Sequence, residues 1–292
     1  MKSFTTRAFL VLFCINSIRM YAQQAPVPSA LKFTQVTGGT LTISQSSNYD
    51  ILQGEKSSLD IKSSFRNTTN LTTSLLTLRT SLRAILGIQN EKNEANEESF
   101  LRATDNELFG EVILTVPLGF QIDPYISANF KTQLTESQRL QKQSLIRTSK
   151  FWDPVTSQQG LGFTYGLNGK VVCFTLRSGA NFQQIRAEDH SELTDNPKTP
   201  TIKELYKATA GMEWVLESTI KLDSLITMRI RAGTQKNILT NDAWNAQSDS
   251  ELSVKVWKII GVVLNLSANY NEQQTKRVQI RQSLQLGFLV DL

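Results

Sequence analysis

The sequence has almost none of the residue types on which metal and nucleophilic sites are usually built. It contains one histidine, His190, and two cysteines, Cys14 and Cys173. Cys14 lies in a segment that we expect to be removed, so Cys173 would remain alone, which excludes an internal disulfide and a thiolate zinc site. His190 lies in an acidic loop whose adjacent side chains point different ways and cannot form a triad by themselves. We therefore expect no metal, no cofactor and no enzymatic activity.

Long apolar runs are also missing. The longest covers about 11 residues, 8–18, whereas a membrane-spanning helix needs roughly 18 or more. Lys2 and Arg7 supply a basic start to this run, and Ala22 ends a plausible cleavage site, which is typical of a secretory signal peptide. The predicted organisation is a signal peptide (1–22), a periplasmic lead-in (23–39) and one outer-membrane domain (40–292).

A strong charge of one sign is missing too. The formal net charge is +5, but Lys2, Arg7 and Arg19 would leave with the signal peptide, so that 28 basic residues face 26 acidic ones. Such a balance excludes the basic footprint of a nucleic-acid-binding protein, and we expect no nucleic acid among the partners.

The sequence is rich in alternation of apolar and polar residues, which is clearest in 276–292. One parity of this stretch is apolar and the other is mostly polar, as in a strand with one face toward lipid. Its length and its place at the end of the chain favour a transmembrane β-barrel. The stretch also resembles the final strand by which bacterial outer-membrane barrels are recognised for insertion, although that pattern usually ends in Phe. The predicted insertion signal consists of Leu284, Leu286, Phe288, Val290 and Leu292.

Twelve segments alternate in this way. They cover 41–43, 59–65, 76–88, 108–118, 126–134, 161–167, 172–182, 206–216, 226–232, 252–256, 262–270 and 278–292. The gaps after odd-numbered segments are long, such as 89–105 and 135–158, and most gaps after even-numbered segments are tight. An even strand count with long loops at one end and short turns at the other is how bacterial barrels are built. We therefore predict an all-β, antiparallel, up-and-down transmembrane barrel of about 12 strands. The alternative is a soluble β-sandwich whose apolar parity forms its core.

Several short stretches resemble an uncharacterised family of outer-membrane β-barrel proteins from Bacteroidota and their relatives. The stretches are Thr40–Ser46, Asp105–Leu108, Tyr125–Gln133, Phe151–Pro154 and Gly160–Tyr165. The resemblance implies the barrel and the membrane, and it implies no activity and no catalytic residues.

The polar parity of the segments carries the candidate functional residues, because it would face the lumen. The predicted lumen-facing set, which would line a channel or form a plug, is Arg79, Arg83, Glu111, Lys131, Arg177, Glu213, Arg229, Arg231, Lys255 and Arg281. Buried charges must be paired or hydrated, so the lumen should hold either a salt-bridged plug or a narrow wet channel. An excess of basic side chains would favour anions.

Two functions follow from a barrel of this kind: a passive small-solute channel, which would favour anions, or a structural membrane component. The alternatives are an adhesin that binds a partner through the long outer loops, or an outer-membrane enzyme that uses His190. The expected partners are membrane lipid, the outer-membrane insertion machinery and small solutes. The expected location is the bacterial outer membrane.

Overall fold

A computed structural model describes residues 31–49, 58–92, 99–119, 121–141, 144–188, 194, 203–238, 244–257, 259–271 and 277–291. Within these ranges, no helix is both long and apolar enough to cross a membrane. The predicted signal peptide, the segment 23–30 and His190 lie outside the described residues.

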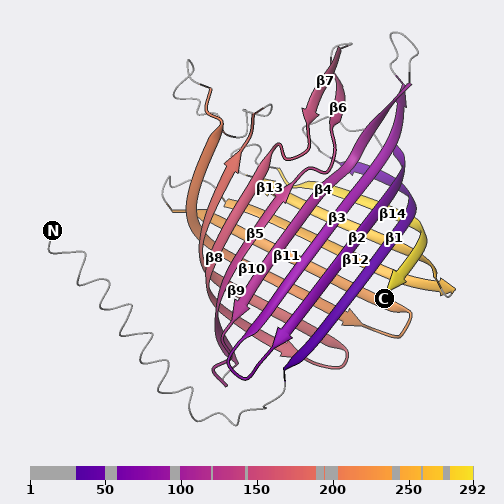
Figure 1. Ribbon diagram of the computed structural model, residues 1–292. Helices are drawn as coiled ribbons and strands as arrows, with labels where there is room; N and C mark the ends of the chain where they lie inside the picture. Colours follow the sequence, from indigo (N-terminus) through magenta and orange to yellow (C-terminus); the bar gives the residue numbers. More distant parts are fainter. Residues whose placement is uncertain are drawn as a thin grey trace.

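The described residues form fourteen strands. Their bounds are β1 Lys32–Tyr49, β2 Ser58–Thr72, β3 Thr77–Lys92, β4 Ser99–Thr115, β5 Ile122–Thr132, β6 Ser137–Gln141, β7 Ser144–Ser149, β8 Val155–Asn168, β9 Val172–Arg186, β10 Tyr206–Lys221, β11 Ile226–Asn237, β12 Trp244–Trp257, β13 Ile260–Asn271 and β14 Gln279–Asp291. Twelve of them close into one barrel, and β6 and β7 form a separate two-stranded sheet (Figure 1).

The barrel is antiparallel throughout and follows the chain. Each barrel strand pairs with the next barrel strand along the chain, so that β5 pairs with β8 and the β6–β7 hairpin is left out of the ring. The ring closes where β1 pairs with β14, in a register from Gly38↔Asp291 to Tyr49↔Ile280. The predicted twelve strands and their order are therefore confirmed. Closure pairs the sheet edges along this seam, which an open sheet of the same strands would leave exposed.

Most apolar side chains lie on the outside of the barrel, and many polar and charged side chains lie inside it. Of the described residues, 42 large hydrophobic side chains are exposed and only five hydrophobic residues are buried, whereas twelve polar or charged residues are buried. A soluble β-sandwich would bury its apolar parity between two sheets. That alternative is wrong here, because the structure has one closed barrel with an apolar outer surface and a polar interior.

The strands extend further than the alternation indicates. β1 begins at Lys32, so 32–39 belongs to the barrel rather than to the predicted lead-in. The expected loop 89–105 is mostly strand, because β3 continues to Lys92 and β4 begins at Ser99. Backbone hydrogen bonds continue the ladder in these stretches, where apolar and polar residues no longer alternate regularly, so the apolar pattern does not mark the strand.

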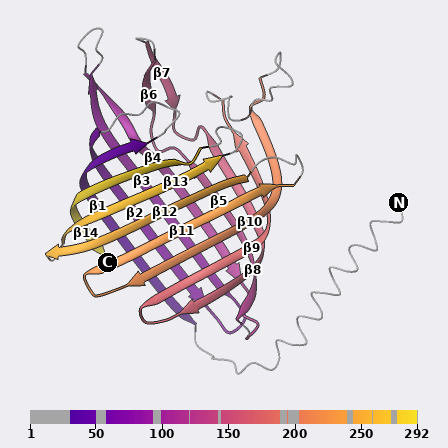
Figure 2. The same cartoon turned by 180° about the vertical axis from the view of Figure 1, so that it is seen from behind.

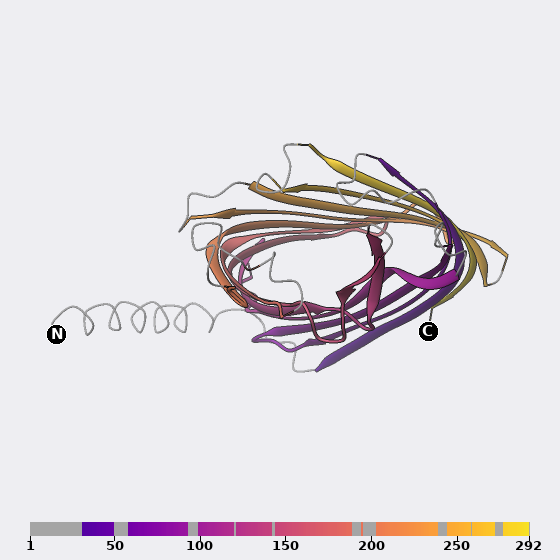
Figure 3. The same cartoon turned by 90° about the horizontal axis from the view of Figure 1, so that it is seen from above.

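The barrel is flattened rather than round. In Figure 1, β2–β5 cross in front of β10–β13, and the view from above shows two broad walls facing each other (Figure 3). The turns at one end span two to six residues, as in 258–259 and 116–121, while the other end carries the longest connections and the β6–β7 hairpin. Side chains from opposite walls are thus directed at one another.

Candidate functional site in the barrel interior

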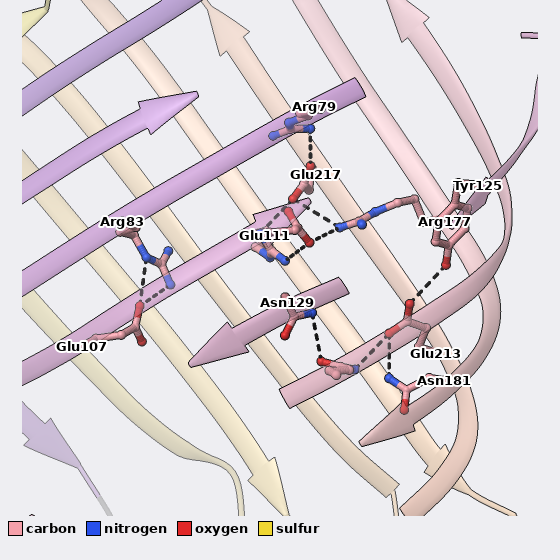
Figure 4. Close-up of polar contacts among 12 residues, drawn as sticks. Arg79, Arg83, Glu107, Glu111, Tyr125, Asn129, Arg177, Asn181, Glu213 and Glu217 are labelled. Carbon is pink, nitrogen blue, oxygen red and sulfur yellow. Dashed lines mark hydrogen bonds and ion pairs between the residues drawn. The ribbon is translucent and has the colours of Figure 1, made fainter. Parts of the chain in front are cut away.

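The centre of the interior is a network of five charged side chains from five strands, Arg79 (β3), Glu111 (β4), Arg177 (β9), Glu217 (β10) and Arg231 (β11), which we call the central network. One oxygen of Glu111 accepts hydrogen bonds from Arg177 at 3.2 Å and from Arg231 at 3.3 Å. Glu217 lies 2.9 Å from Arg79, 2.9 Å from Arg231 and 3.6 Å from Arg177. Glu217 pairs with Arg231 and Arg177 between neighbouring strands, whereas the pair of Arg79 with Glu217 and the pairs of Glu111 with Arg177 and Arg231 cross the interior between strands that are not neighbours (Figure 4).

The carboxylate of Glu213 lies beside this network but is held by neutral groups. It accepts hydrogen bonds from the Tyr125 hydroxyl at 3.1 Å, from Gln158 at 3.0 Å and from Asn181 at 2.8 Å (Figure 4). Gly160 leaves the space for it, because a Cβ there would lie 2.7 Å from a Glu213 oxygen. Three donors from three strands fix this buried carboxylate without a cation.

Three further carboxylates each lie between two basic side chains. Glu107 contacts Arg83 at 2.6 Å and Lys131 at 2.8 Å, and Arg83 also lies over the ring of Phe109. The second carboxylate, Glu251, lies 2.7 Å from Arg229 and 3.2 Å from Arg66. The third, Asp105, lies 3.2 Å from Lys62 and 3.2 Å from Arg281.

Burial divides the interior into a dry part and a wet part. The side chains of Arg177 and Glu111 are only 4% and 2% exposed. By contrast, Arg66, Arg229 and Lys131 are 43%, 39% and 47% exposed, although each is ion-paired. Solvent therefore reaches these cations, whereas the contact of Arg177 with Glu111 is buried.

Basic side chains outnumber acidic ones in these clusters. The nine basic members are Lys62, Arg66, Arg79, Arg83, Lys131, Arg177, Arg229, Arg231 and Arg281, and the six acidic members, with Glu213 included, are Asp105, Glu107, Glu111, Glu213, Glu217 and Glu251. The clusters therefore hold an excess of positive charge, which a mobile anion neutralises at the least cost.

The structure brings nine of the ten predicted lumen residues into these clusters. The tenth, Lys255, lies half-buried on β12 with the parity of Glu251. The predicted set did not include Lys62, Arg66, Glu107, Glu217 and Glu251, nor Asp105, which lay in an expected loop. For Lys62 and Arg66 the alternation in the sequence would have indicated an inward side chain, because they alternate with the outward Ile61 and Phe65 on β2.

The predicted insertion signal lies on β14. Leu284, Leu286, Phe288 and Val290 all have exposed side chains, while Gln285 between them is buried. Leu292, the last predicted member, lies outside the described residues.

Other chemistry is sparse in the part of the chain that the structure describes. It holds no group of three or more His, Cys, Asp or Glu side chains that would bind a metal ion. Cys173 is exposed, and its thiol donates a hydrogen bond to the Gly169 carbonyl at 3.2 Å. Just beyond the end of β9, the exposed Glu188 accepts hydrogen bonds from Lys150 and Arg186, which hold the pKa of its carboxyl below its usual range.

No family model and no curated protein matches this chain, so the resemblance to a Bacteroidota family stays a prediction. Solved barrels match its shape at low identity. The translocator domain of the autotransporter NalP from Neisseria meningitidis is 11% identical with a TM-score of 0.40, covering 98% of this chain and 96% of its own. Outer membrane phospholipase A from Escherichia coli is 12% identical with a TM-score of 0.40, covering 93% and 96%. An outer-membrane channel from Pseudomonas putida F1 is 11% identical with a TM-score of 0.39, covering 88% and 95%. No score reaches 0.5, so no property of those proteins carries over to this chain.

Proposed function

We propose that this protein is an outer-membrane β-barrel that acts as a narrow passive channel for small solutes and favours anions. The long connections and the β6–β7 hairpin face the outside, the short turns face the periplasm, and the insertion machinery recognises β14. An apolar outer wall around a charged interior supports the membrane location, because lipid-facing and lumen-facing residues alternate in barrels of this class.

The observation that carries the proposal is the set of water-accessible cations inside a closed barrel. Arg66, Arg229 and Lys131 are about half exposed, although they lie within the ring of strands. An aqueous path lined by such side chains concentrates anions and repels cations. The dry contact between Arg177 and Glu111 narrows this path, which restricts it to small solutes.

The rival function is a structural membrane component in which the same charges form a complete plug. The central network favours it, because its ion pairs span the interior from wall to wall. The two functions differ in whether ions pass beside the network, which electrical recording measures directly.

The test is single-channel recording of the purified protein in a planar bilayer, with the reversal potential measured in a potassium chloride gradient. We expect small discrete steps and a reversal potential of the sign that anion flow produces. Replacing Arg66 and Arg229 together by Gln should lower the chloride-to-potassium permeability ratio, because it removes two wetted cations. Arg186→Gln is the control, since this exposed side chain pairs with Glu188 beyond the interior clusters.

Silence from a properly inserted, heat-modifiable barrel would establish the plug and refute the channel. Cation selectivity would leave a channel but contradict the role assigned to the interior arginines. An unchanged permeability ratio in the double variant would place the ion path away from Arg66 and Arg229.

A further inference from the structure

The wall formed by β10–β13 faces the viewer in Figure 2. Its outer side contains a depression, because the sequence places small residues side by side on these strands. The register aligns Trp214, Thr234, Ala246 and Tyr270 across the four strands in one row. The next row aligns Leu216, Ala232, Ser248 and Ala268. Directly opposed residues share one face of a sheet, so each row has small side chains in the middle and a bulky one at the β10 end.

These rows lie on the outer face. Leu216 is exposed, whereas its chain neighbour Glu217 and its cross-strand counterpart Arg231 have the opposite parity and belong to the central network. The small residues are therefore the floor of a groove on the surface that faces lipid in the proposed function.

The groove has a volume of about 410 Å³, which lies within the range of small-molecule sites. Leu176, Trp214, Leu216, Tyr270 and Val278 contribute the bulky parts of its lining. The indole of Trp244 stacks on that of Trp214 with the ring centroids 5.9 Å apart, which extends the aromatic side of the groove. A lining of this kind matches a hydrocarbon chain, because almost all of the surface that it exposes is apolar.

A cation lies beyond the groove on the same face. Lys236 is opposite Trp244 in the register, and its ammonium lies 5.4 Å from the centroid of that indole ring. No carboxylate of the described residues lies within ion-pair distance of this ammonium. Trp244 begins β12 at the end of the barrel with the long connections, so the cation lies where lipid headgroups are expected.

We propose that this groove binds an acyl chain of an anionic phospholipid, with the phosphate at Lys236. The inference rests on the membrane location in the proposed function, and it does not depend on whether the interior conducts. A zwitterionic phospholipid such as phosphatidylcholine would fit the hydrocarbon groove equally well, but its own choline already neutralises its phosphate, so Lys236 would gain less from it.

The test is native mass spectrometry of the detergent-solubilised protein, titrated with phosphatidylglycerol and with phosphatidylcholine of the same acyl chains. The wild type should retain one phosphatidylglycerol molecule more tightly than phosphatidylcholine. Ala246→Trp fills the floor and should remove retention of both lipids. Lys236→Gln should remove the preference, about fivefold, while leaving chain binding in place.

Ala128→Trp is the matched control, because Ala128 is an exposed alanine on β5 and is not part of the groove. It should retain both lipids as the wild type does. Should Ala246→Trp fail to insert, Ser248→Phe fills the same floor and gives the same expectation. Equal lipid retention by the wild type and by an inserted groove-filling variant would overturn the proposal, and so would dimers of the wild type that exclude lipid.

The experiments can refute the lipid site and the channel independently of each other. A silent barrel with the expected lipid pattern would refute the channel alone. An anion-selective barrel that retains lipid equally in all variants would refute the lipid site alone.

Discussion

Removing the charge of Glu111 should destabilise the barrel more than removing an exposed carboxylate. Glu111→Gln keeps the size of the side chain but leaves Arg177, only 4% exposed, without its 3.2 Å partner. Breaking a buried pair typically costs 3–5 kcal/mol, and we take about 3 kcal/mol because Arg177 keeps Glu217 at 3.6 Å. That free energy lowers the folding equilibrium constant by roughly a hundredfold.

The assay is equilibrium unfolding in urea with the protein in lipid vesicles, followed by tryptophan fluorescence. With an m-value of about 3 kcal/mol per molar urea, the midpoint should fall by about 1 M. Glu188→Gln is the matched control, because it removes the same charge from an exposed carboxylate. If Glu111→Gln unfolds at the same urea concentration as Glu188→Gln, the central network contributes no more than a surface pair and the reasoning fails.

A double-mutant cycle separates the pair from the burial of its members. Replacing Glu111 by Leu alone leaves Arg177 charged and buried, whereas replacing both by apolar residues of similar volume removes the unpaired charge. The double variant should therefore be more stable than Glu111→Leu, although it lacks the contacts of both charged side chains. Equal stability of the two variants would show that the interior hydrates Arg177 as soon as its partner is removed.

Three further predictions concern other parts of the molecule. Gly160→Ala should cost about 1–3 kcal/mol of unfolding free energy, because its Cβ would disturb the hydrogen-bonded Glu213, whereas Gly166→Ala, whose Cβ would meet nothing within 4 Å, should be neutral. An NMR titration should place the pKa of Glu188 below that of an unpaired glutamate carboxyl, so its hydrogen bonds to Lys150 and Arg186 persist while the group is ionised and are lost as the pH falls through the lowered value; an unshifted or raised pKa would contradict the contact. Deleting the β6–β7 hairpin should leave conductance and selectivity unchanged in bilayer recordings, and a loss of conductance would show that the hairpin belongs to the channel.

Alternation predicts the twelve barrel strands because lipid on one side and water on the other impose it residue by residue. Strand ends are different, because beyond the lipid the ladder needs only backbone hydrogen bonds. β3 therefore continues to Lys92 without an apolar parity to mark it. The β6 strand, SQRLQ, has five mostly polar residues and lies in a polar connection, so the sequence shows no apolar alternation that would indicate its pairing with β7.

Parity assigns a face to each interior side chain but not a partner. Arg79 and Glu217 are 138 residues apart in the chain, and they meet because the flattened barrel brings β3 opposite β10. The cross-section depends on how all strands are staggered, so no local pattern contains it. Glu217 was also expected in a tight turn, whereas β10 continues to Lys221 and keeps Glu217 on the inner face.

The flattened cross-section links the stability of the interior to its selectivity. Walls close enough for Arg231 to reach Glu111, while it also pairs with Glu217 on the neighbouring strand, allow charges to be neutralised across the interior rather than by water alone. Because the clusters contain fewer carboxylates than basic side chains, pairs share acceptors, as Arg66 and Arg229 share Glu251. A shared carboxylate neutralises only part of each cation, and the remaining positive charge stays on the side chains that water reaches. The ion pairs that hold the walls together therefore leave a residual field that attracts anions.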